Sequence, residues 1–207
     1  NASDVLKTIK KHYASIPAQK SVEREIPVEP EQKSTRKKVM KLNLQVQKLM
    51  MGYRVTESDH PDVPAINLLR SVLSSGRSSR LERALVDSGV ASSQGMYDLD
   101  DKDPSLLIFS ASLQKGRKSE EAESIILREI EKLQKNLVSD TELEKAKNQL
   151  AFEFYSELSD SNAKANFLGL HETINGDFMK GLETIEKLSS LQAKDIRDVA
   201  RKYLNPE

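Results

Sequence analysis

The 207-residue chain contains no cysteine and no tryptophan, and aromatic residues make up only 5% of it. Without cysteine, disulfide bonds, thiolate nucleophiles and cysteine-based zinc sites are all excluded. No apolar run approaches the roughly 18–20 residues that a membrane-spanning helix needs. Residues 1–4 have neither the basic region nor the apolar stretch of a signal peptide, so we predict none within this sequence.

The chain also lacks net charge, because 32 lysine and arginine residues balance 32 aspartate and glutamate residues. No global field therefore attracts nucleic acid or an anionic membrane. The one basic run, residues 36–38, is interpreted as a solvent-exposed strand start, since nucleic-acid-binding proteins gather far more positive charge on one face. We expect neither a nucleic acid nor a membrane as a partner.

What the sequence does contain is an ordered series of helical and strand-like patterns. Ser3 or Asp4 is predicted to cap an amphipathic helix that ends before Pro17. The apolar face of this helix consists of Val5, Leu6, Ile9 and Tyr13. Residues 18–35 are polar, include two prolines and show no periodicity, which indicates an extended linker.

Two strand-like runs follow, at residues 37–44 and 46–55, either as separate strands or as one long bent strand. Residues 58–62 have the composition of a helix start, and residues 63–73 repeat apolar side chains at helical spacing before a break at Gly76. The remaining predicted elements are a short helix at 80–88, strands at 91–99 and 105–113, and helices at 119–136, 139–154, 163–175, 177–188 and 192–203.

Strands that precede a helix-rich tail indicate an α+β fold. We predict two layers, a mainly antiparallel sheet with helices packed on one of its faces. Ser139 and Glu142 have the S-x-x-E spacing of a capping box at the start of one tail helix.

Several segments, in their order and spacing, resemble the second domain of pitrilysin/insulinase-type (inverted-zincin) zinc metallopeptidases. The resemblance covers residues 39–207, and its most informative part is the apolar helix followed by S-S-G-R-S-S-R-L at residues 74–81. It implies a processing-peptidase-like fold for residues 36–207, with a final strand missing after Glu207. Residues 1–17 are then the terminal helix of a preceding domain, and residues 18–35 are the linker.

The resemblance also determines where a metal would be expected. These enzymes bind zinc through the two histidines of H-x-x-E-H on one helix face and a distant glutamate. When the closing glycine of that motif helix is aligned with Gly76, the His, Glu and His positions are occupied by Asn67, Arg70 and Ser71. We interpret the helix as a degenerate copy of the metal helix that now serves packing. Zinc would be bound by an upstream domain of the full-length enzyme, and none is expected on this chain.

The three histidines do not supply a replacement site. His171 begins an H-E-x-x-N sequence that has Asn175 where a second histidine is required. His171 is interpreted as a partly buried or surface residue near a helix end. His60 is interpreted as a polar residue of a helix N-terminal turn, and His12 as a solvent-exposed residue.

The second domain of this family usually carries an arginine and a tyrosine that bind the substrate backbone. The matching positions here are Val86 and Ser92, so the pair is absent or relocated. Arg80 is expected to cap the preceding helix. The acidic cluster of Asp98, Asp100, Asp101 and Asp103 lacks the spacing of a calcium loop and is interpreted as a solvated hairpin tip.

The resemblance implies the substrate-chamber domain of a zinc-dependent endopeptidase, without catalytic or metal-binding residues and with substrate-binding residues unknown. Its expected partners are the N-terminal domain of the same chain, a homologous second subunit or second copy, and a peptide substrate. The alternative is a non-catalytic scaffold subunit of a processing-peptidase-like complex. The location is left open, with the bacterial periplasm and the cytoplasm as the favoured compartments.

Overall fold

The computed structural model describes residues 1–19, 27, 29–30, 32–98 and 102–205, and the chain divides into two compact units, Asn1–Thr35 and Arg36–Glu207. The first unit contains α1 (Ala2–Tyr13), which confirms the predicted amphipathic helix. The predicted cap was wrong, because the side chain of Asn1 accepts the hydrogen bond from the Ser3 amide at 3.1 Å. α1 has no buried residue, so its apolar face is exposed. Part of the predicted linker lies outside the described residues.

The second unit is built on a three-stranded antiparallel sheet with the strand order β1-β3-β2. The strands are β1 (Lys48–Arg54), β2 (Ala91–Asp98) and β3 (Leu106–Leu113). The predicted strand at residues 37–44 was wrong, since this segment forms no ladder with the described residues. An apolar pattern can favour a strand, but a strand also requires a partner for its backbone groups.

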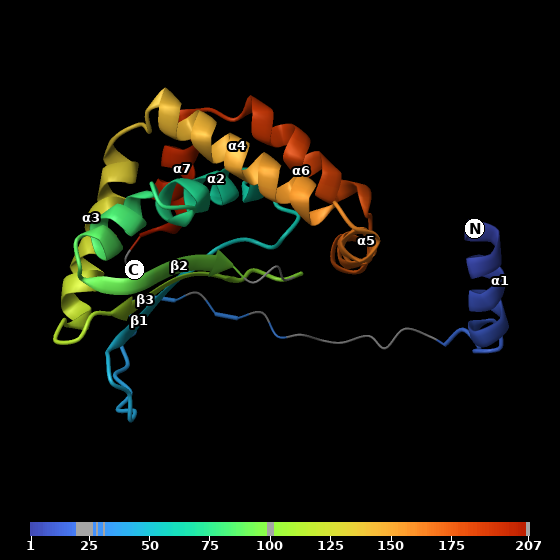
Figure 1. Cartoon of the computed structure of the whole chain (residues 1–207), viewed down its shortest axis with the longest axis horizontal. Helices are drawn as coiled ribbons and strands as arrows, with labels where there is room; N and C mark the ends of the chain where they lie inside the picture. Colours follow the sequence, from blue (N-terminus) through green and yellow to red (C-terminus); the bar gives the residue numbers. More distant parts are fainter. Residues whose placement is uncertain (20–26, 28, 31, 99–101, 206–207) are drawn as a thin grey trace. The chain divides into compact units, whose positions relative to one another are not determined.

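Six α-helices and one π-helix complete the second unit within the described residues. They are α2 (Val63–Ser74), the π-helix η1 (Glu82–Asp87), α3 (Ser119–Lys135), α4 (Asp140–Glu157), α5 (Ser161–Asn175), α6 (Met179–Ser190) and α7 (Ala193–Tyr203). The helices lie on one side of the sheet (Figure 1). The predicted α+β fold with helices on one face is therefore confirmed. Among the described residues, no helix is both long and apolar enough to cross a bilayer.

The core lies between the sheet and α2. Leu68 and Leu73 of α2 and Phe109 of β3 are fully buried, and the ring of Tyr53 on β1 meets that of Phe109 edge-on at 5.7 Å. Burial of such a side chain contributes about 1.5–3 kcal/mol. The helix ends at Ser74, and the chain turns at Gly76, whose φ of 76° lies in the left-handed region that glycine adopts readily. This turn therefore takes the chain out of the helix, as the sequence predicted.

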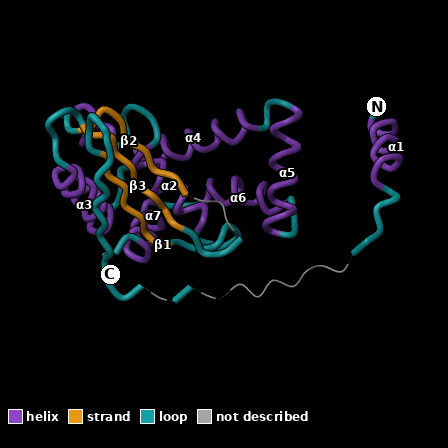
Figure 2. Tube along the Cα trace, turned by 90° about the horizontal axis from the view of Figure 1, so that it is seen from below, coloured by secondary structure: helices purple, strands orange, loops and turns teal. Residues whose placement is uncertain are grey.

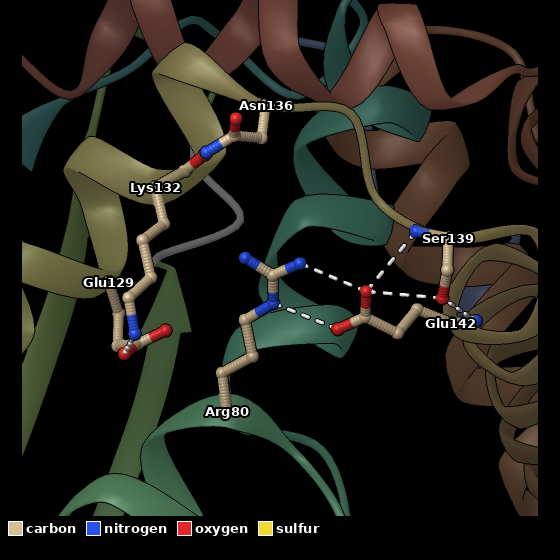
Figure 3. Close-up of polar contacts among 6 residues, drawn as sticks. All are labelled: Arg80, Glu129, Lys132, Asn136, Ser139 and Glu142. Atoms are coloured by element: carbon tan, nitrogen blue, oxygen red, sulfur yellow. Dashed lines mark hydrogen bonds and ion pairs between the residues drawn. The ribbon is translucent and has the colours of Figure 1, made fainter.

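The turn after α2 is tied to α4 by an ion pair between two segments far apart in the sequence. Arg80 donates hydrogen bonds from Nε and Nη2 to the two carboxylate oxygens of Glu142, at 2.8 and 2.9 Å (Figure 3). Glu142 also closes the predicted capping box with Ser139, which is confirmed. The expectation that Arg80 caps the preceding helix was wrong, because its guanidinium reaches a partner 62 residues away. Figure 3 also shows Glu129 paired with Lys132 on α3, at 2.5 Å.

The start of α2 is fixed by the last helix. Asp62 Oδ2 accepts hydrogen bonds from Lys202 Nζ at 2.7 Å and from the Tyr203 hydroxyl at 2.6 Å. Burial alone would raise the pKa of Asp62, but these two hydrogen bonds lower it below its ordinary value. The ionised carboxylate is therefore the favoured form, and it links the start of α2 to the end of α7.

Candidate functional site

The positions that align with the metal motif lie on α2, and their side chains have other roles. Ser71 is only 3% exposed and belongs to the buried side of the helix. Arg70 Nη1 lies 3.3 Å from Asp98 Oδ1 and so links α2 to β2. Together with Asn67, they offer an amide, a guanidinium and a hydroxyl, a set that does not fit zinc. Over the described residues, no group of three or more His, Cys, Asp or Glu side chains is arranged to bind a metal ion.

His60 and His171 lie near helix ends and His12 is exposed, as predicted. His60 Nδ1 accepts a hydrogen bond from the Asp62 amide at 3.0 Å in the turn before α2. His171 lies on α5, with Nδ1 at 3.1 Å from Asn175 Nδ2 and its ring packed against Phe167 at a centroid distance of 4.5 Å. His12 is exposed on α1. His60 and His171 therefore each have a local structural contact.

The positions of the family's substrate-binding pair lie at the π-helix and the strand after it. Val86 is partly buried in η1, the π-helix that forms within the short helix predicted at residues 80–88. Ser92 is exposed at the start of β2 and donates a hydrogen bond from Oγ to the Ser112 carbonyl at 3.2 Å. Neither side chain supplies the cation or the phenol of the usual pair. Of the acidic cluster, Asp98 pairs with Arg70, while Asp100 and Asp101 lie outside the described residues.

The most distinctive surface of the second unit is the sheet face that the helices leave uncovered, which we call the open face. Figure 2 views the sheet from this side, with the strands in front of the helices. Side chains alternate between the two faces of a strand, so the register assigns each residue to a face. The centre of the open face consists of Met50 and Gly52 on β1, Ile108 and Ser110 on β3, and Gly95 and Tyr97 on β2.

The centre of the open face is neutral and partly apolar. Met50 is 64% exposed and Tyr97 is 39% exposed, whereas their neighbours on the opposite face pack into the core. Along the strands that form this face, positive charge lies at Lys48 and Arg54, towards the ends of β1. Such a surface suits an uncharged ligand, because a charged ligand group would lose its hydration there without meeting an opposite charge.

The sheet also has two outer strands, and they differ in their surroundings. On β2, the Gln94 side chain accepts a hydrogen bond from Ser74 Oγ at 2.7 Å and donates one to Glu82 at 3.1 Å, which joins this strand to α2 and η1. The outer edge of β1 pairs with no strand of the described residues. A free edge presents backbone groups that can pair with an extended peptide.

No substrate-binding residue could be named from the sequence, so the open face was not predicted. The sequence does contain one relevant pattern, an alternation with a period of two in residues 48–54. It places Met50 and Gly52 on the opposite strand face from their apolar neighbours. Alternation defines two faces, but it does not say which face the helices cover.

Comparisons with known proteins agree with this architecture. Residues 1–150 match the sequence family described as the peptidase M16 inactive domain. The zinc protease PqqE of Helicobacter pylori is 28% identical over 208 residues, which cover 98% of this chain and 46% of that protein. This chain therefore spans about half the length of its curated relative.

Solved structures share the fold. A crystallised protease from Helicobacter pylori superposes with a TM-score of 0.92 at 27% identity, over 100% of this chain and 51% of that one. A peptidase M16 inactive domain from Pseudomonas fluorescens gives a TM-score of 0.80 at 20% identity, over 99% of this chain and 48% of that one. The latter likeness concerns the fold alone.

Proposed function

Because the chain belongs to the family of the peptidase M16 inactive domain, we propose that it forms the non-metal wall of the peptide chamber in a zinc-dependent endopeptidase. This family agrees with the resemblance to pitrilysin/insulinase-type peptidases. In this role the chain binds and orients a peptide, while the bond-breaking chemistry belongs to a preceding half that carries the metal.

The observation that carries the proposal is the open face. Its helix-free surface is neutral at the centre, and it lies beside the outer edge of β1, which pairs with no strand of the described residues. A peptide in extended conformation can present its side chains to such a face and its backbone to such an edge. The remaining sheet face is occupied by the core, so it is not available for binding.

The partner that fits best is a preceding half of similar size. The curated relative named a zinc protease is about twice as long as this chain, which covers 46% of it. The exposed apolar face of α1, made of Val5, Leu6, Ile9 and Tyr13, offers that half a packing surface of its own. A homologous second subunit or a second copy would enclose the chamber further.

Co-expression of this chain with the upstream half encoded by its own gene tests the proposal. We expect the chain alone to hydrolyse no peptide, and the combined halves to cleave an unstructured peptide in a chelator-sensitive way. The upstream half alone serves as the control and should be much less active. Full activity of the upstream half by itself, or no activity of the combination, would contradict a role of this chain in the chamber.

A further inference from the structure

Gly52 occupies a position where the fold itself does not require glycine. Its backbone is not in the left-handed region, since the glycines with positive φ among the described residues are at positions 76, 89, 116 and 176. A Cβ added at Gly52 would meet only Leu106 side-chain atoms, at 3.7 and 3.9 Å, which are ordinary contact distances. Glycine in the middle of a strand is unfavourable, because it loses the most conformational entropy and packs no side chain.

The other glycine of the open face differs in this respect. A Cβ at Gly95 would lie 3.2 Å from Ser110 Oγ, and this hydroxyl donates a hydrogen bond to the Gly95 carbonyl at 3.2 Å. Close packing inside the sheet therefore accounts for Gly95. It does not account for Gly52, which is exposed on β1.

A strand glycine that the fold does not need often marks a place where another backbone approaches closely. The surroundings of Gly52 restrict what that backbone can carry. Ile108 lies opposite Gly52 in the register, and the exposed side chains of Met50 and Leu106 lie on the same face. An apolar side chain gains burial against these neighbours, whereas a charged one loses hydration without finding a counter-charge at the centre of the face.

We infer that the chain selects an extended, uncharged and largely apolar peptide segment, whose backbone lies against Gly52 at the centre of the open face. This inference rests on the proposed function, because it names the class of peptide that the chamber wall accepts. The role of Gly52 is to leave room for that backbone, and the role of Met50, Leu106 and Ile108 is to contact its side chains.

Binding to the whole chain tests this inference. The probe is a capped, fluorescent peptide of about eight residues, the length of these strands, made of valine, leucine and alanine. Two matched peptides carry lysine or glutamate at two central positions. We expect the apolar peptide to bind at least about tenfold more tightly than either charged peptide, a difference that follows from the cost of burying an unpaired charge.

The variant Gly52→Val separates binding from folding. Valine favours strands, so the variant should unfold at the same or a higher temperature than the unaltered chain. Its affinity for the apolar peptide should nevertheless fall by about tenfold or more, because the side chain fills the space of the ligand backbone. Gly169→Val on α5 is the control for the glycine change, since nothing lies within 4 Å of a Cβ built there. This control should leave peptide affinity unaltered.

A photo-reactive benzoylphenylalanine in place of Met50 locates the bound peptide. The same residue in place of Tyr155, exposed on α4, measures background labelling. Labelling at position 50 with equal affinity of Gly52→Val and the unaltered chain overturns the inference but leaves the chamber wall in place. Equal affinity for the three peptides would also overturn the inference and leave the proposed chamber wall in place. Labelling at position 50 that does not exceed the background contradicts both the inference and the proposed function.

Discussion

The pair of Arg80 and Glu142 shows how a single residue can join two parts of the chain. Its two parallel hydrogen bonds link the turn after α2 to the first turn of α4. The Arg80 guanidinium lowers the pKa of Glu142 below its ordinary value of 4.5, burial opposes this, and the hydrogen bonds at Ser139 add to the lowering. The ionised carboxylate is therefore the form that stabilises the fold.

This shift predicts a pH dependence of stability. Because the pKa of Glu142 is lower in the folded chain than in the unfolded chain, its contribution is complete above the unfolded pKa, which is about 4.3–4.5. The contribution is lost as the pH falls through the folded pKa. At neutral pH, Glu142→Gln should lower the free energy of unfolding by about 1 kcal/mol, a modest value because the pair is partly exposed to solvent. Below about pH 4 the difference should shrink.

Urea unfolding at several pH values measures this difference. Glu144→Gln is the matched control on the same helix, since Glu144 is exposed and lies 3.7 Å from Lys147. The control should change stability little at any pH. A constant difference between Glu142→Gln and the unaltered chain from pH 7 to pH 3 would show that the pair does not titrate as described.

At the scale of single elements, α2 is a packing helix. Leu68, Leu69 and Leu73 fill the core, while Arg70 holds β2 through Asp98. The helix is therefore committed to packing. The positions aligned with the metal motif differ in burial, because Ser71 is buried and Asn67 is only partly buried.

The same substitution at these two positions should have different effects. Ser71→His adds volume inside a packed region and should cost about 1–3 kcal/mol of stability. Asn67→His should change stability by less than about 0.5 kcal/mol, as expected for a more accessible site. Denaturant unfolding of the two variants compares them directly. Equal effects would mean that α2 does not use its Ser71 side as a packing surface.

Local patterns in the sequence were sufficient to predict most elements. The apolar spacing of residues 63–73 and the following glycine predicted α2 and its end, and the Ser139 capping box predicted the start of α4. The strand predicted at residues 37–44 failed, because its pattern reports apolar character but not the presence of a pairing strand. Arg80 was assigned to a neighbouring helix because a partner 62 residues away leaves no local signal.

At the scale of the whole molecule, the two faces of the sheet have different surroundings. One face and the helices bury the core, and the other remains available for a ligand. The sequence predicted the two layers, but the covered face follows from tertiary packing, so the open face emerged only from the register and the helix positions. The absence of a metal motif in the sequence remains the basis for expecting the chemistry elsewhere.

We propose that this chain contributes a peptide-binding wall and not the metal. Calorimetric titration of zinc into the purified chain, and into the chain joined to the upstream half of its gene, tests it most directly. We predict no binding tighter than about micromolar to the chain alone and one tightly bound zinc ion in the joined protein. Binding of one zinc ion to the chain alone with micromolar or tighter affinity, lost in the variants Asn67→Ala and Ser71→Ala, would contradict this proposal.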